Sequence, residues 1–111
     1  MRSLAVLPLV LFCLPACGGA LAEGESQFKK GQYPQAKQTL ASIEAQSRSY
    51  DDGRRAEYAL YRGLTLSALG DRAAGGVWLR EAKAIADTDP TSLEREDALR
   101  LKEALEADEA R

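Results

Sequence analysis

The feature that most constrains the fold of this chain is an internal repeat with a period of 39 residues. Self-similarity at a spacing of roughly 20–50 residues indicates repeated supersecondary units that pack on one another. Shifting the chain by 39 residues superimposes two pairs of glycines and one pair of leucines: Gly24 on Gly63, Gly31 on Gly70 and Leu40 on Leu79. We therefore predict two copies of a helical pair, each bent at a tight glycine turn and packed closely through small residues.

The periodicity after residue 22 is that of helices. Apolar residues recur at spacings of three and four, and no segment shows the sustained two-residue alternation of a strand. Ala, Leu, Glu, Gln, Lys and Arg, which favour helices, dominate this part of the chain. We expect an all-α fold with helices at about 34–46, 55–69, 72–86 and 92–108, preceded by a short helix within 22–30.

Local signals mark the ends of these helices. Gly70 is expected to be a left-handed cap and Asp71 the N-cap of the next helix. Thr91 and Glu94 have the spacing of a capping box before the last helix. We expect the inward-facing residues to be Ala74, Val77, Trp78, Ala82 and Ile85 in one helix and Ala98, Leu101 and Leu105 in the next.

The repeat resembles the tetratricopeptide-repeat (TPR) family. The segments that carry the resemblance are 31–40 (GQYPQAKQTL) and 63–82, which share the turn glycine, a small residue and a leucine. The family repeats about every 34 residues, so a loop at 48–55 would supply the extra residues. The resemblance implies a short TPR-like array of antiparallel helical hairpins, about two repeats with a C-terminal capping helix. An unrelated small helical bundle is the alternative.

The resemblance also implies a binding surface. In this family the first helix of each pair lines a concave groove that receives a partner peptide. Tyr61 joins this set as an aromatic anchor, because aromatic residues dominate binding hot spots. Tyr58 and Tyr61 have two open interpretations, interface or core, whereas Trp78 is expected in the core. The predicted partner-binding residues are Glu57, Leu60, Tyr61, Leu64, Ser67 and Ala68.

The N-terminus has the pattern of an export signal. Arg2 precedes an apolar run at 4–14, which is too short to span a membrane. Leu14-Pro-Ala-Cys17 resembles the lipobox of bacterial lipoproteins, which implies cleavage before Cys17 and acyl chains such as palmitate on that residue. We thus expect a signal peptide at 1–16, a tether at 17–26 and a helical domain at 27–111. The alternative is cleavage after Ala22 in an A-x-A pattern, which would release a soluble chain.

The composition argues against several classes of chemistry. The chain has no histidine, and its 15 basic and 17 acidic residues leave a net charge of −2. A basic surface for nucleic acid is therefore not expected. Without histidine, most catalytic triads and many metal sites are excluded. We expect no enzymatic activity, no metal, no cofactor and no nucleic-acid partner.

These observations favour a membrane-anchored interaction module of the bacterial cell envelope. Similar repeat lipoproteins serve as adaptors in secretion, pilus or outer-membrane assembly systems, so the expected partner is another protein. Gly18, rather than an aspartate, follows Cys17, which by analogy places the anchor in the outer membrane with the domain facing the periplasm. The alternatives are a self-associating structural protein and a soluble secreted domain.

Overall fold

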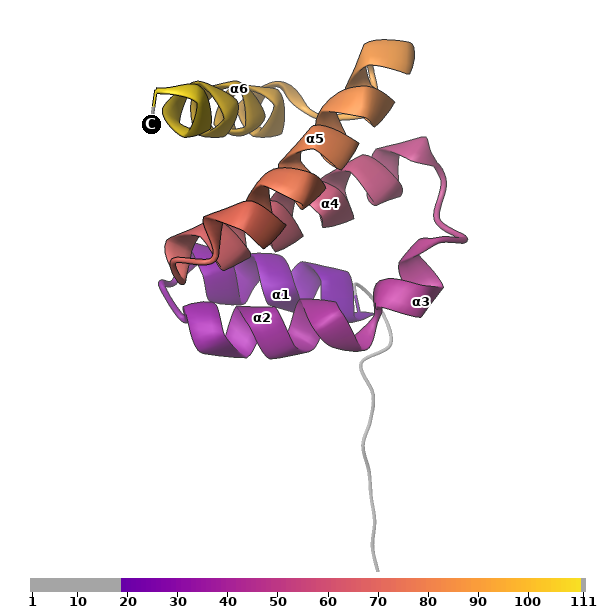
Figure 1. Ribbon diagram of the computed structural model, residues 1–111. Helices are drawn as coiled ribbons and strands as arrows, with labels where there is room; N and C mark the ends of the chain where they lie inside the picture. The colour runs from indigo at the N-terminus through magenta and orange to yellow at the C-terminus, as the bar shows by residue number, and fades with distance from the viewer. Residues whose placement is uncertain (1–18, 111) are drawn as a thin grey trace, which may run out of the picture.

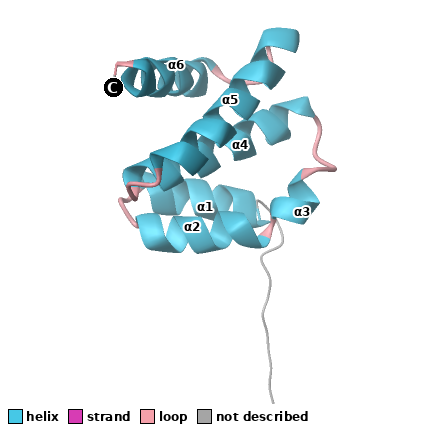
Figure 2. Ribbon diagram, viewed as in Figure 1, coloured by secondary structure: helices cyan, strands magenta, loops and turns pink. Residues whose placement is uncertain are grey.

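The computed structural model describes residues 19–110, and over this range the protein is all-α, as predicted (Figure 2). No strand occurs among these residues. None of their helices is both long enough and apolar enough to cross a membrane. The helices are α1 (Gly19–Lys29), α2 (Tyr33–Ser42), α3 (Glu44–Ser47), α4 (Asp52–Ala68), α5 (Arg72–Thr88) and α6 (Arg95–Glu109).

Four of the helices form two antiparallel hairpins, α1–α2 and α4–α5 (Figure 1). Each hairpin turns at a glycine with a left-handed backbone: φ is +78° at Gly31 and +91° at Gly70. Residues with a Cβ rarely adopt this conformation, so glycine is required at both turns. The two turns lie one repeat period apart, and Gly70 is the left-handed cap that the sequence predicts.

Each hairpin contains the same close contact between its two helices, at equivalent positions of the repeat. A Cβ added to Gly24 would lie 2.7 Å from Cγ of Leu40, and one added to Gly63 would lie 2.7 Å from Cγ of Leu79. In both hairpins the missing side chain lets a leucine of the second helix rest on the backbone of the first. The internal repeat therefore has a physical basis in helix packing, while membership of the TPR family stays a prediction.

Some helix ends lie where the sequence predicts them, and others do not. Asp71 caps α5 by accepting a hydrogen bond from the Ala74 N–H at 3.2 Å. The predicted capping box at Thr91 and Glu94 is wrong. Both the N–H and the hydroxyl of Thr91 donate to Oδ1 of Asp89, at 3.2 and 2.8 Å. The last helix consequently starts later than expected, after Glu94, whose side chain makes no capping bond.

The core lies between the two hairpins and under α6. Its most deeply buried large side chains are Leu40, Tyr58, Leu60, Tyr61 and Leu79, each at most 1% exposed. Val77, expected to face inward, is 58% exposed. The reason is the helical spacing: the buried face of α5 is Gly75, Leu79, Ala82 and Ile85, and Val77 points the opposite way. Ala98, also expected inward, is exposed on α6.

The first helix begins earlier than expected. Residues 19–26 of the predicted tether belong to α1, and the helical domain therefore begins at Gly19 rather than at residue 27. Leu21 is 4% exposed and Gly24 is buried, so this segment supplies part of the core. Its small residues look like linker composition, but Leu21, Gly24 and Phe28 follow the spacing of a packed helix face.

Candidate functional site

The six predicted partner-binding residues all lie on α4, but two of them are inaccessible. Leu60 and Tyr61 are each 0% exposed, so the prediction that they meet a partner peptide is wrong. Glu57, Leu64 and Ser67 are half-buried, and only Ala68 is exposed. The face of α4 that was expected to line an open groove is therefore largely covered by the protein's own side chains.

Tyr61 is covered from both sides by other helices. The ring of Phe28 on α1 meets it edge-on at a centroid distance of 5.7 Å, and Nζ of Lys29 lies 5.7 Å from its ring centroid. Its hydroxyl donates a 2.7 Å hydrogen bond to Oδ1 of Asp97 on α6. Burial, together with this bond to a carboxylate, raises the pKa of Tyr61. Tyr61 thus joins α1, α4 and α6 and is a core residue rather than an interface anchor.

The remaining predicted residues do not form one continuous surface. Leu64 packs against the core, and Ser67 faces α5, where a Cβ added to Gly75 would meet its Oγ atom. Glu57 lies nearer the start of α4 and belongs to a different, polar cavity. The resemblance to a repeat family predicted which helix carries these residues. It did not predict their exposure, because that depends on α1 and α6.

The polar cavity contains a carboxylate cluster formed by Glu25 of α1, Glu57 of α4 and Asp97 of α6. The cavity has a volume of about 290 Å³, and Lys29 and Arg54 also line it. Burial raises the pKa of Glu25 to about 9, and a hydrogen bond to Glu57 and the charges of Glu57 and Asp97 act in the same direction. At neutral pH, Glu25 therefore keeps its proton.

No pattern in the sequence predicts the carboxylate cluster. Its members are far apart in the chain, and each one alone resembles an ordinary charged residue on a helix surface. The arrangement does not amount to a metal centre: in the described part of the chain, no three His, Cys, Asp or Glu side chains are placed to hold a metal ion. The carboxylate cluster instead lies where α1, α4 and α6 pack together, with the proton on Glu25.

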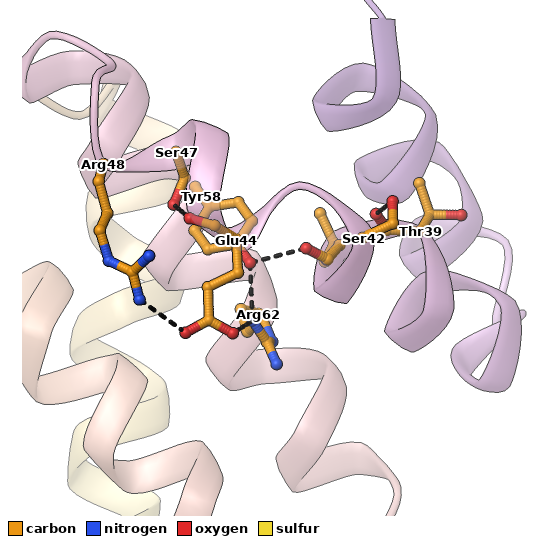
Figure 3. A network of polar contacts seen from close by, with 8 residues as sticks. Thr39, Ser42, Glu44, Ser47, Arg48, Tyr58 and Arg62 are labelled. Atoms are coloured by element: carbon orange, nitrogen blue, oxygen red, sulfur yellow. Dashed lines mark hydrogen bonds and ion pairs between the residues drawn. The ribbon is translucent and has the colours of Figure 1, made fainter.

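A second polar network fixes the connection between the two hairpins (Figure 3). The hydroxyl of Tyr58 donates to the Leu40 carbonyl at the end of α2, at 2.7 Å. Arg62 in turn donates to the Tyr58 hydroxyl at 2.7 Å and to Oε1 of Glu44 at 2.8 Å. The bond from Arg62 lowers the pKa of Glu44. This network holds α2 and α3 against α4.

Two of the aromatic residues belong to the same network. Tyr58 is 1% exposed, which answers the question left open by its sequence pattern: it is a core residue. Trp78 on α5 is half-buried, and its ring meets that of Tyr58 edge-on at 5.5 Å. The guanidinium of Arg62 lies 4.9 Å from the ring centroid of Trp78, within the range of a cation–π contact.

A largely apolar groove lies between α5 and α6. This α5/α6 groove has a volume of about 540 Å³, and its apolar lining includes Ala86, Leu93, Leu101 and Leu105. Leu93 and Leu101 form a buried floor, 8% and 6% exposed, while Leu105 is half-buried. The sequence predicted that Leu101 and Leu105 face inward, but not that the helices separate enough to leave a groove.

Cys17, the predicted lipidation site, lies outside the described residues, so its modification stays a prediction. No family model, no curated protein and no solved structure matches this chain.

Proposed function

We propose that this protein is a lipid-anchored, non-enzymatic interaction module of the bacterial cell envelope. The anchor is Cys17, and the helical domain faces the periplasm from the outer membrane. There it binds another protein of an envelope complex, of the kind that serves secretion, pilus or outer-membrane assembly.

The observation that carries this proposal is the burial of Leu21 in α1. Cleavage before Cys17 leaves α1 complete, because the helix begins at Gly19. Cleavage after Ala22 would instead remove the first turn of α1 together with Leu21, which is 4% exposed in the core. Loss of a buried leucine side chain typically costs about 2–5 kcal/mol of stability. The structure thus favours the lipoprotein site over the A-x-A site.

The position of the anchor has a geometric consequence for the domain. Cys17 and Gly19 are two residues apart, and an extended chain spans at most about 3.6 Å per residue. A lipid on Cys17 would hold the start of α1 within about 7 Å of the membrane surface. The domain would therefore lie at the membrane surface rather than at the end of a long tether. This position would favour contact with other membrane-bound proteins.

The side chains with strongly shifted pKa values support a structural role rather than catalysis. Glu25 and Tyr61 are the two groups with the largest upward shifts, and both are explained by burial between helices. Strong shifts often mark catalytic sites, but ion and hydrogen-bond networks that hold a fold together produce them as well. Here Tyr61 of α4 bonds to Asp97 of α6, and Glu25 of α1 lies beside Glu57 of α4, so both shifted groups lie where helices pack together.

The experiment that tests the anchor is the intact mass of the mature chain from a membrane fraction. We expect a chain that begins at Cys17 and carries the added mass of acyl chains. Cys17→Ala should abolish this mass and release the chain from the membrane, whereas the matched control Cys13→Ala, inside the predicted signal peptide, should leave both unchanged. An unmodified chain that begins at Glu23 would overturn the anchor.

The interaction role is tested separately, by cross-linking in intact cells followed by mass spectrometry. The proposal expects one envelope protein to be linked to the wild-type chain and to be lost with Cys17→Ala, because detachment removes the domain from the membrane. A set of linked proteins that is the same with and without the anchor would contradict the proposal.

A further inference from the structure

The spacing of 39 residues continues beyond the two hairpins into α6. An Ala-Leu pair lies in the first helix of each hairpin and again in α6, at Ala20-Leu21, Ala59-Leu60 and Ala98-Leu99. The packing repeats as well, because α4 lies against α1 and α2, and α6 lies against α4 and α5 (Figure 1). α6 therefore has the place of the first helix of a third hairpin.

Within the α4–α5 hairpin, the second helix covers one face of the first. Cγ of Leu79 lies 2.7 Å from the Cβ that Gly63 would carry. The ring centroid of Trp78 lies 4.9 Å from the guanidinium of Arg62. Spacings of three and four place two buried residues of α4 on the same side of the helix. The face that α5 covers thus consists of Ala59, Arg62, Gly63 and Leu66.

The corresponding face of α6 is open. The four residues that lie 39 positions farther along the chain all line the α5/α6 groove: Ala98, Leu101, Lys102 and Leu105. Within the described residues no helix follows α6. The groove consequently lies where the second helix of a third hairpin would pack. The shape that this place accepts is a single helix, antiparallel to α6.

The end of α6 gives the groove a negative charge. Residues 103–109 include four acidic side chains and no basic one. Glu106 and Glu109 line the groove, are exposed and belong to none of the ion pairs of residues 19–110. The C-terminal end of a helix also carries partial negative charge. A helix antiparallel to α6 would begin at this end, so Lys or Arg in its first turns would be complementary to both glutamates.

The two basic residues on the α5 side of the groove have acidic neighbours of their own. Nζ of Lys83 pairs with Asp87 at 2.7 Å. Nη1 of Arg80 and Oδ2 of Asp108 lie 3.2 and 3.6 Å from the same point, the Cβ that Gly76 would carry. These two opposite charges are therefore neighbours, and Glu106 and Glu109 remain for an incoming helix.

Lys102 determines how closely an incoming helix can approach. It has the position of Gly24 and Gly63, where a leucine of the second helix rests on the backbone of the first. A lysine side chain prevents so close an approach. The incoming helix therefore needs large apolar side chains to reach Leu101 and Leu105 in the groove.

We infer that the α5/α6 groove binds a basic amphipathic helix of another protein, antiparallel to α6. Large apolar side chains of this helix would contact Leu101 and Leu105, and its first turns would place Lys or Arg beside Glu106 and Glu109. The inference rests on the proposed function, because it assigns the surface that the partner protein contacts, but it does not depend on the lipid anchor.

The test is photochemical cross-linking in intact cells, with p-benzoylphenylalanine in place of Ala98, an exposed residue at the groove. Mass spectrometry then identifies the linked segment. We expect one segment of another protein, whose apolar residues recur at spacings of three and four and whose N-terminal half carries net positive charge. The same photoreactive residue in place of Lys37, which is exposed on α2, should not link that segment.

Charge reversal tests the predicted complementarity. The double variant Glu106→Lys/Glu109→Lys should lower the yield of this cross-link by at least about tenfold, because it places like charges together. Glu103→Lys is the matched control: Glu103 is exposed on the same helix but does not line the groove, so the yield should change little. Circular dichroism of the purified variants shows whether each keeps its helices.

Several results would overturn the inference. These are a cross-link to a second copy of this chain, to lipid or to an acidic segment, and a yield that the double variant does not lower. If an envelope protein is linked at other positions but never at position 98, the inference fails and the proposed function stands. If the basic helix is linked equally with and without Cys17→Ala, the proposed function fails and the inference stands.

Discussion

Two adjacent glycines of α5 show how strongly the surroundings of a residue determine the effect of its substitution on stability. A Cβ on Gly75 would lie 2.9 Å from the Gly63 carbonyl oxygen and would also meet Oγ of Ser67 on α4. A Cβ on Gly76 would lie 3.2 Å from Nη1 of Arg80, the far end of a flexible side chain. The backbone contact cannot move without separating α4 from α5, whereas the arginine can change rotamer.

We therefore expect opposite results from the same substitution at these two positions. Gly75→Ala should lower the free energy of unfolding by about 1–3 kcal/mol, because it forces the α4–α5 hairpin apart. Gly76→Ala should leave it unchanged or raise it by up to about 1 kcal/mol, since alanine is the better helix former. Urea unfolding followed by circular dichroism measures both. Equal effects would show that helix propensity rather than packing controls α5.

At the scale of the elements, two tyrosines of α4 attach different parts of the protein to the same helix. The hydroxyl of Tyr58 bonds to the Leu40 carbonyl at the end of α2, and that of Tyr61 bonds to Asp97 near the start of α6. The two residues are three positions apart and equally buried. They form a matched pair, in which removal of one hydroxyl should loosen one attachment only.

Tyr61→Phe should destabilise the protein by about 1–3 kcal/mol, because it removes a bond to a charged group and leaves the Asp97 carboxylate without this partner. The amide protons of α6 should then exchange faster with solvent, while those of α2 and α3 stay protected. Tyr58→Phe should produce the reverse pattern. Faster exchange over the whole domain in both variants would mean that these helices unfold as a single unit.

At the scale of the whole molecule, the carboxylate cluster couples stability to pH. An unfolded glutamate loses its proton near pH 4.5, whereas Glu25 keeps it in the folded chain until about pH 9. Between these values the folded state binds more protons than the unfolded state, so the free energy of unfolding falls as pH rises. The lowered pKa of Glu44 acts in the opposite direction, but only below about pH 4.5, because a depressed carboxyl pKa matters below its unfolded value.

The wild-type protein should accordingly be more stable at pH 5 than at pH 8. Glu25→Gln should remove most of this dependence and raise the stability at pH 8, because the amide carries no charge into the cluster. Glu23→Gln, a change at an exposed position of the same helix, is the control and should preserve the slope. Thermal unfolding across this pH range measures the effect. If the stability of the wild-type protein did not change with pH, Glu25 would not hold a proton in the folded chain at neutral pH.

Much of the fold was predictable because it depends on neighbours in the chain. The helical periodicity, the left-handed turn at Gly70 and the cap at Asp71 each involve residues within a few positions of one another. The repeat was detectable for a related reason, since contacts such as Gly63 with Leu79 join helices that are adjacent in sequence. The capping box at Thr91 was mispredicted because Asp89, two residues earlier, accepts the bond from the Thr91 N–H that the Glu94 side chain was expected to accept.

The candidate site, in contrast, depends on helices that meet only in the folded chain. Tyr61 is buried because Phe28 approaches from α1 and Asp97 from α6, and the period of α4 carries no information about either. For the same reason the protonation of Glu25, the packing of Leu21 and the α5/α6 groove were not predictable. Helix formation is a local property of the chain, whereas exposure and pKa are set by whichever distant residues pack alongside.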